Sequence, residues 1–224
     1  SSDTRLKSYI TLADLFIVPV NLLIIVLLCF LLSQKYKQTD VYGYFWIGLA
    51  LRLFGGVMLY IYQRYIYGWG DMFVYYQGIK EYHQALYEYP LDWLQSLTKV
   101  GGEYSAAMQK ICVDEVHLTS EEALTIQFGS ILGITSFDSF TSTSLWFSLF
   151  SYFGSWRLYF VFRDRYPTMN KTLAIPFLFI PSCFFWGTCI TKDAIALGAF
   201  GLFFHSFYFL FFKRRFRIGT LFWL

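Results

Sequence analysis

The sequence is poor in charged residues and in cysteine motifs. Only 15% of its 224 residues are Asp, Glu, Lys or Arg, whereas a soluble domain carries about 25%. Its four cysteines form no CxxC pair and no Cys/His cluster at metal-binding spacing. These shortages argue against an ordinary soluble domain, a structural zinc site and a disulfide framework.

Motifs of soluble enzymes are also missing. The chain has no GxSxG, no P-loop, no HExxH and no GxGxxG pattern. It therefore offers no nucleophile elbow, phosphate-binding loop, zinc-protease helix or dinucleotide fingerprint. The net charge of +3 is not gathered into a basic stripe on a polar surface, which argues against nucleic-acid binding.

Apolar and aromatic side chains are abundant instead. Hydrophobic residues make up 56% of the chain and aromatic residues 23%, as suits lipid-facing surfaces and interfacial aromatic belts. Apolar runs occur at about 10–32, 44–67, 143–162, 172–190 and 194–212. Each is close to the ~20 residues that a helix needs to cross a bilayer core. The sequence therefore predicts an all-α, polytopic membrane protein with about five to six transmembrane helices.

The basic residues between these runs predict the topology. They gather in three of the gaps: Lys35, Lys37, Arg163, Arg165, Lys171, Lys213, Arg214, Arg215 and Arg217. The positive-inside rule places these gaps on the cytoplasmic side of a cell membrane. The segment 70–124 and the turn at 191–193 then face outward. A further apolar stretch, 125–137, is short for a span and is expected to be an interfacial or re-entrant element.

The outward-facing loop 70–124 is too polar to span, with nine acidic residues against three lysines. Apolar side chains recur every three or four residues over 72–89 and again over 91–100. This spacing predicts two amphipathic helices on the outer membrane surface. Residues 1–224 are interpreted as one membrane domain. The new apolar run at 218–224 predicts another helix, and hence a larger protein.

Some of the apolar runs contain arginine or proline. An arginine in the hydrocarbon zone costs several kcal/mol unless it snorkels or finds a partner. Arg52 is expected to snorkel toward the cytoplasmic side, whereas Arg64, near the outer end of its run, is the better functional candidate. Pro176 and Pro181 predict a kinked or partly unwound fourth helix.

The candidate site gathers ionisable residues expected at the outer surface: Arg64, Asp71, Tyr75, Asp138, Lys192 and Asp193. Asp71 would act as a general base on a sugar hydroxyl. Lys192 would neutralise a phosphate of a lipid-linked donor, and Asp193 would orient Lys192 or bind a metal ion. The structural alternative makes Asp71 and Asp193 helix caps and Lys192 an interfacial anchor.

Two segments carry a resemblance to a known family. The run GDMFVYY at 70–76 resembles the Gly-Asp-x-x-x-Tyr element of GT-C membrane glycosyltransferases. The run IPSCFFWGTCITKD at 180–193 is similar to a Pro…Trp…Lys-Asp/Glu signature of bacterial relatives and polysaccharide-polymerase-like proteins. The resemblance loosely covers residues 44–212. The chain departs from the family by placing two apolar runs, not one, before the acidic loop.

This resemblance implies a function and its partners. A GT-C enzyme would sit in the bacterial inner membrane and use a polyprenyl-phosphate-linked sugar donor and a glycan acceptor at the outer leaflet. Asp71 would be its catalytic base. A divalent ion, Mg²⁺ or Mn²⁺, is a possible cofactor. The process served would be the assembly of a cell-surface polysaccharide or glycan.

A second class of function is also open, a non-enzymatic membrane scaffold or transporter subunit whose outer helices bind a partner. The enzyme requires Asp71 and the turn at 192–193 to face one cleft, whereas a scaffold does not. A transporter would carry ionisable residues near the bilayer midplane. In this sequence they concentrate near the outer boundary, which favours the enzyme.

Overall fold

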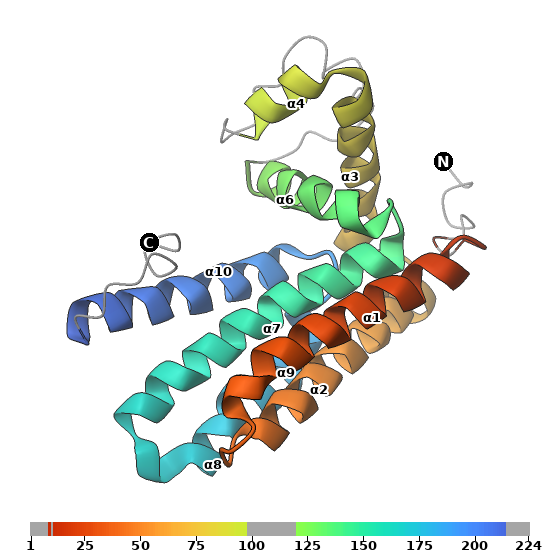
Figure 1. The fold of residues 1–224 in the computed structure, drawn as a ribbon. Helices are drawn as coiled ribbons and strands as arrows, with labels where there is room; N and C mark the ends of the chain where they lie inside the picture. The colour runs from red at the N-terminus through yellow and green to blue at the C-terminus, as the bar shows by residue number, and fades with distance from the viewer. Residues whose placement is uncertain (1–8, 10, 98–119, 214–224) are drawn as a thin grey trace.

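The computed structural model describes residues 9, 11–97 and 120–213, and every regular element in these ranges is a helix (Figure 1). The all-α prediction is confirmed for this part of the chain. The elements are α1 (Asp14–Ser33), η2 (Gln34–Tyr36), α2 (Tyr42–Ile61), η3 (Tyr62–Tyr67), α3 (Asp71–Glu88), α4 (Pro90–Ser96), α6 (Ser120–Ser136), α7 (Phe140–Arg165), η4 (Pro167–Met169), α8 (Asn170–Ala174), η5 (Ile175–Phe179), α9 (Pro181–Trp186), α10 (Lys192–Phe207) and η6 (Tyr208–Phe212). The run at 218–224 and the middle of the loop 70–124 lie outside the described residues.

The helices α1, α2, α7 and α10 form a bundle in which α1, α7 and α10 run in one direction and α2 runs in the opposite direction (Figure 1). α7 lies at its centre and packs against the other three. Most of α7 is buried even though its sequence is rich in serine. Small serine and glycine side chains let neighbouring helices approach closely, which explains how such a polar sequence can form the middle of an apolar bundle.

The predicted fourth helix is broken into short pieces, as its two prolines suggest. α8 leads into the π-helical turn η5, which contains Pro176. Ile180 is then extended, with φ −67° and ψ 125°, and Pro181 begins α9. A proline removes one backbone donor and crowds the preceding turn, so the apolar run 172–190 cannot continue as one regular helix.

Arg52 holds this broken helix and does not snorkel, so that prediction is wrong. Its side chain is 1% exposed. Nη1 donates to the carbonyls of Cys183 at 2.7 Å and Gly187 at 3.1 Å and to Ser151 Oγ at 3.1 Å. Nη2 donates to Ser155 Oγ at 2.7 Å. These acceptors replace the hydrogen bonds that the guanidinium would make to water. Burying Arg52 among the helices therefore costs less free energy than the sequence analysis assumed.

Three helices are long and apolar enough to cross a membrane: Asp14–Tyr36, Tyr42–Tyr67 and Lys192–Phe212. Most of the apolar surface of the first is exposed, as contact with lipid requires. This supports a membrane location with transmembrane helices. A count of five to six is not confirmed, because α7 is made too polar by its serines and the fourth run is broken.

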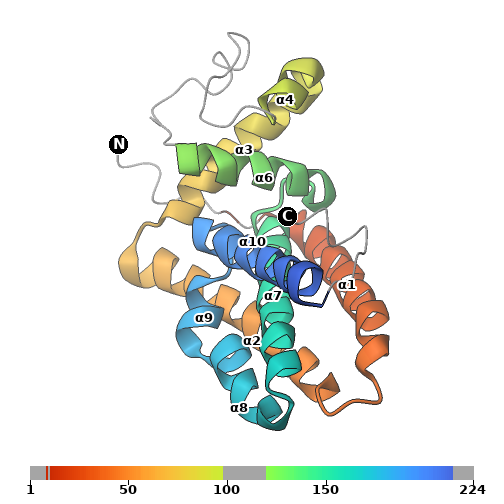
Figure 2. The ribbon, with the colours of Figure 1, turned by 90° about the vertical axis from the view of Figure 1, so that its left-hand side faces the viewer.

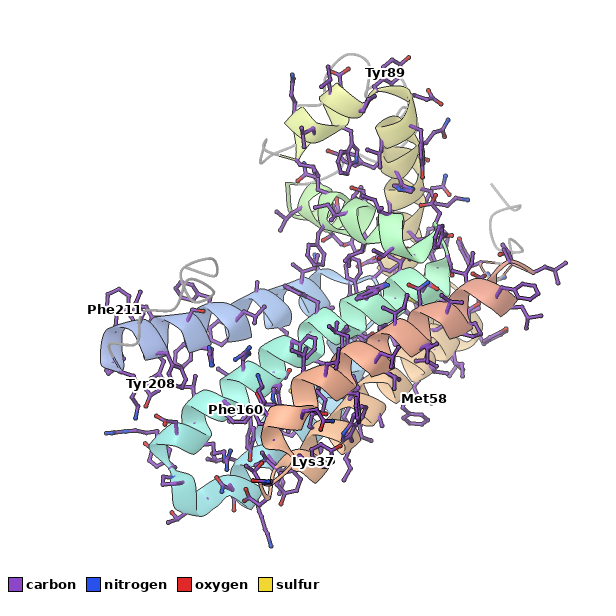
Figure 3. All side chains as sticks on the ribbon, in the orientation of Figure 1. Lys37, Met58, Tyr89, Phe160, Tyr208 and Phe211 are labelled. Carbon is purple, nitrogen blue, oxygen red and sulfur yellow. The ribbon has the colours of Figure 1, made fainter. Side chains whose placement is uncertain are left out.

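Basic residues gather at one end of the bundle, called the basic end, where α1 turns into α2 and α7 turns into α8. Lys37 lies there in Figure 3. Arg163 Nη2 is 3.2 Å from Asp40 Oδ1, which joins the two turns. Lys213 Nζ is 2.8 Å from Asp164 Oδ2. The basic gaps of the sequence therefore meet in space.

The helices α3, α4 and α6 form a separate layer above the opposite end of the bundle, called the layer end (Figures 1 and 2). The predicted amphipathic helices are present as α3 and α4. The apolar face of α3 packs against α6 and the bundle, whereas the sequence suggested that it contacts the membrane. α6 is one continuous helix packed along α3, which gives the segment 125–137 a protein partner for its apolar side chains.

Candidate functional site

Asp71 and Lys192 begin two helices that start close together. The first turns of α3 and α10 lie at the junction of layer and bundle in both views (Figures 1 and 2). Met72 and Ala194, one and two residues further on, belong to the same hydrophobic cluster. Asp71, Lys192 and Asp193 are themselves exposed, so their charged groups lie at the surface.

The backbone before Asp71 turns in the way its glycines predict. Gly68 has φ +82°, a left-handed conformation that glycine adopts at little cost. Gly70 is the N-cap of α3 and supplies no side-chain hydrogen bond. α10 is capped by Thr191, whose hydroxyl accepts from the Ala194 backbone N–H at 3.2 Å.

The interpretation of Asp71 and Asp193 as N-caps is therefore wrong. Both are in the first turn of their helices, where the partial positive charge of the helix terminus favours a carboxylate. Within the described ranges, the carboxylate of Asp71 has no hydrogen-bond or ion-pair partner. The Asp71 carboxylate is therefore exposed at the start of α3 and is not held by these residues.

Arg64 lies near the start of α3, in the π-helical turn η3 at the end of α2. Its guanidinium lies over the ring of Tyr9, 5.9 Å from the centroid. Tyr9 in turn stacks on Phe73 with 4.6 Å between ring centroids. Burial raises the pKa of Tyr9, and Arg64 partly opposes this shift. Only the ring of Tyr9 therefore separates the guanidinium of Arg64 from Phe73 in the first turn of α3.

Tyr75 and Asp138 lie elsewhere. Tyr75 is buried in the core between layer and bundle, so it does not face the exposed surface that carries Asp71. Asp138 lies in the turn between α6 and α7 with φ +54°. Its carbonyl accepts from Tyr76 Oη at 2.6 Å. The six predicted residues therefore do not form one group.

His83 is the polar residue that sequence reasoning missed. It is 2% exposed, and its Nδ1 is 2.6 Å from Asp138 Oδ1. The two side chains are thus in close polar contact, although their angles do not suit a hydrogen bond. His83 follows Tyr76 and Ile79 at seven- and four-residue spacing on α3, so the helical period could have placed it on the buried face.

The His83–Asp138 pair belongs to a polar contact between α3 and the α6–α7 turn. Burial and then the Asp138 carboxylate raise the pKa of the neighbouring Tyr76 to about 12. Tyr76 thus stays a neutral hydrogen-bond donor at physiological pH. We interpret Asp138 as a residue that fixes the layer on the bundle.

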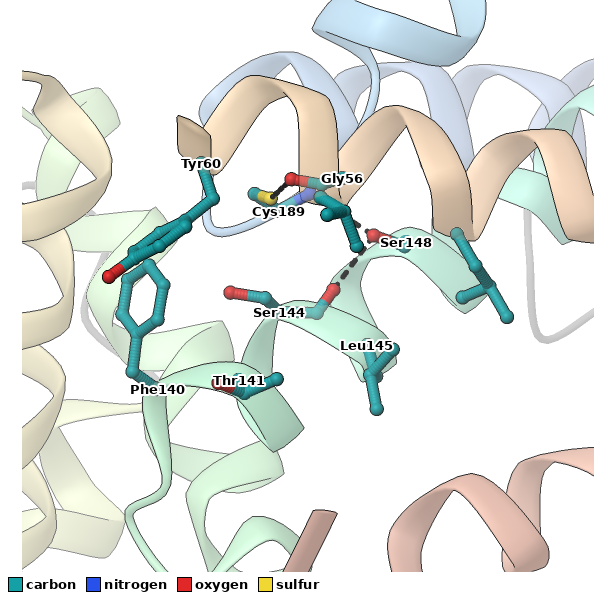
Figure 4. A pocket seen from close by; sticks show the side chains of 10 residues that line it. Gly56, Tyr60, Phe140, Thr141, Ser144, Leu145, Ser148 and Cys189 are labelled. Carbon is teal, nitrogen blue, oxygen red and sulfur yellow. Dashed lines mark hydrogen bonds between the residues drawn. The ribbon is translucent and has the colours of Figure 1, made fainter. Parts of the chain in front are cut away.

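A pocket of about 180 Å³ lies between α2 and α7 near the layer end (Figure 4). Its lining is largely apolar with hydroxyl groups from α7: Leu53, Gly56, Val57, Tyr60, Phe140, Thr141, Ser144, Leu145, Ser148 and Cys189. Tyr60 and Phe140 stand together at one wall, 5.6 Å between ring centroids. Cys189 closes another wall by donating its Sγ–H to the Gly56 carbonyl at 3.2 Å.

Chemically, the layer end combines an apolar pocket with nearby cations and free carboxylates. Among the described residues, no group of three or more His, Cys, Asp or Glu side chains is placed to hold a metal ion. Comparison with known protein families, with curated proteins and with solved structures found no match.

Proposed function

We propose that the protein is a multi-pass membrane glycosyltransferase of the GT-C kind that acts at the outer leaflet of a bacterial inner membrane. The basic end would be cytoplasmic by the positive-inside rule. The chain would cross with α1, α2, α7, the broken segment α8–α9 and α10. Its role would be to transfer sugar from a polyprenyl-phosphate-linked donor during assembly of a cell-surface polysaccharide or glycan.

The observation that carries this proposal is the position of the apolar pocket beside the ionisable residues. Tyr60 on the pocket wall lies 6.2 Å from Phe73 between ring centroids, and Arg64 follows it one helical turn later. A lipid-linked donor has an isoprenoid chain, which needs an apolar groove, and a phosphate, which needs cations. The layer end offers both within a few side chains.

The chemistry assigned to these residues is a sugar transfer. Asp71 takes the proton of an acceptor hydroxyl, whose oxygen forms a new bond to the anomeric carbon of the donor. The bond from that carbon to the lipid phosphate breaks, and the phosphate leaves with the electron pair. Lys192 and Arg64 stabilise the negative charge on the departing phosphate. No step is assigned to a metal ion.

The first prediction tests Asp71. Asp71→Asn should lower the rate of sugar transfer about 10²–10⁴-fold, because general-base assistance is worth that much. Asn keeps the shape of the side chain, so the thermal unfolding temperature should be unchanged. Turnover is measured with the purified full-length protein, a polyprenyl-phosphate-linked sugar donor and a glycan acceptor.

The matched control is Asp92→Asn, the same substitution in the first turn of the neighbouring helix α4. It should keep full turnover. If the two variants have equal activity, Asp71 is not the base and the proposal fails.

One observation favours the alternative of a non-enzymatic scaffold or transporter subunit. Leu91 and Leu94 of α4 are exposed on the layer, and apolar side chains away from the membrane helices are typical of a surface that binds a partner. This alternative predicts no transfer activity in the full-length protein, and no difference between the two Asn variants in stability.

A further inference from the structure

A second cavity, of about 200 Å³, lies between α1, α7 and α10 near the basic end. Apolar and aromatic side chains such as Leu32, Phe153 and Leu202 line it, together with the cations of Lys35 and Arg157. Arg157 is placed about two turns before the C-terminal end of α7. The cavity therefore combines two basic groups with apolar walls. We call it the α1–α10 groove.

The two cations of the groove differ from Arg163 and Lys213, two other basic residues at this end. Arg163 and Lys213 each lie beside a carboxylate, from Asp40 and Asp164 respectively. Among the described residues, no carboxylate lies within 4 Å of Lys35 or Arg157. His205 of α10 lies within electrostatic range of both. The groove is thus positively charged, which favours an anion.

Trp156 supplies a second, independent observation. It lines the groove and is 2% exposed, and its Nε1–H has no acceptor among the described residues. A buried donor without an acceptor costs free energy, and the great majority of such groups find a partner. The wall of the groove thus contains a donor that the described residues leave without an acceptor.

The surroundings indicate that the occupant has apolar chains. α1 and α10, which flank the groove on either side of α7, are both long and apolar enough to cross a membrane. Large apolar side chains on these helices, such as Leu31 and Phe203, are exposed beyond the groove. An occupant in this place meets lipid on its apolar side and cations on its polar side.

We propose that the α1–α10 groove binds an anionic glycerophospholipid from the leaflet at the basic end. Its phosphate lies between Lys35 and Arg157, and its acyl chains run along the exposed faces of α1 and α10. The site is distant from Asp71 and independent of sugar transfer, because it lies at the other end of the bundle.

The test compares lipid retention by the purified full-length protein, measured by native mass spectrometry. The protein is reconstituted with phosphatidylglycerol and phosphatidylcholine in equal amounts. The parent protein should retain phosphatidylglycerol selectively. Each of Lys35→Gln and Arg157→Gln should weaken this retention about fivefold, the effect of one basic residue near an anionic lipid, and the double variant should lose the selectivity.

The control is the double variant Lys37→Gln, Lys171→Gln, which removes two exposed basic residues of the same end outside the groove. It should retain phosphatidylglycerol like the parent protein. Equal losses in both double variants would mean general attraction to a basic surface and would overturn the site. Displacement of the lipid by inorganic phosphate would identify a phosphate-ion site instead.

A folding control separates binding from stability. Arg157→Lys keeps a cation in the groove and should keep most of the retention. If Arg157→Gln fails to fold, Lys35→Gln alone decides, because Lys35 is exposed and its loss should not affect folding. Unchanged retention in Lys35→Gln would refute the proposal.

Discussion

At the scale of single residues, Arg52 shows how a cation can be buried among membrane helices without a carboxylate. Two of its acceptors, the carbonyls of Cys183 and Gly187, belong to the C-terminal end of α9. Helix C-termini carry partial negative charge and unpaired carbonyls. Arg52 therefore stabilises the end of a short helix that a proline has separated from the preceding turn.

This contact gives a prediction for stability. Arg52→Ala should lower the free energy of unfolding by about 3 kcal/mol, because it removes a buried donor from the Gly187 carbonyl and from the hydroxyls of Ser151 and Ser155. Arg52→Lys should recover only part of the loss, since an ammonium cannot reach acceptors on α7 and α9 with the same planar fork. Denaturation of the purified protein in detergent, followed by circular dichroism, measures both changes.

The exposed Lys37 is the control, and Lys37→Ala should change stability by less than about 0.5 kcal/mol. An Arg52→Ala variant as stable as the parent protein would show that the four hydrogen bonds contribute nothing net. The position of Arg52 in an apolar run was visible in the sequence. Its acceptors were not, because Ser151 follows it by 99 residues and Gly187 by 135.

Contacts between residues far apart in the chain also limited the prediction of the candidate site. Helical periodicity in 72–89 was enough to predict α3 and its apolar face. That Tyr75 is buried follows from its place on this face, but the sequence hypothesis assigned it to the substrate. The pairing of His83 with Asp138 spans two elements, and no local pattern predicts which of two buried polar residues meet.

At the scale of helices, close packing of α7 and α10 depends on glycine. A Cβ added at Gly201 would lie 2.0 Å from the Gly154 carbonyl oxygen, and one added at Gly154 would lie 2.5 Å from Gly198 Cα. These are backbone atoms, which cannot move without separating the helices. Glycines such as Gly198 and Gly201 in an apolar helix permit close packing, and the structure identifies α7 as the partner.

Gly201→Ala should therefore destabilise the protein by about 1–3 kcal/mol, the cost of overpacking a tight contact. Gly43→Ala is the matched control, because a Cβ there meets nothing within 4 Å. In a helix, that second change should be neutral or stabilise by about 0.5–1 kcal/mol. Thermal unfolding of the two variants compares them directly. Equal behaviour would mean that α10 can move away from α7 at no cost.

At the scale of the whole molecule, the gaps rich in basic residues lie at one end of the bundle, as the order of charges along the sequence predicts. Positive-inside reasoning used only the order of basic residues along the sequence, and contacts such as Arg163–Asp40 bring the basic turns to one end of the bundle. The layer of α3, α4 and α6 lies at the other end (Figure 1). The sequence could not predict that this layer packs on the bundle, because that contact joins residues far apart in the chain.

The two ends should consequently face opposite sides of the membrane, with the layer outside. Gln84 on α3 and Lys37 at the basic end are both exposed and suit substitution by cysteine in a variant without native cysteines. In intact cells, a membrane-impermeant maleimide should label Gln84→Cys. Lys37→Cys should be labelled only after the membrane is permeabilised, because the positive-inside rule predicts that its turn lies in the cytoplasm. Labelling of Lys37→Cys in intact cells would show that the topology is the reverse of the predicted one and that Asp71 does not lie at the outer leaflet.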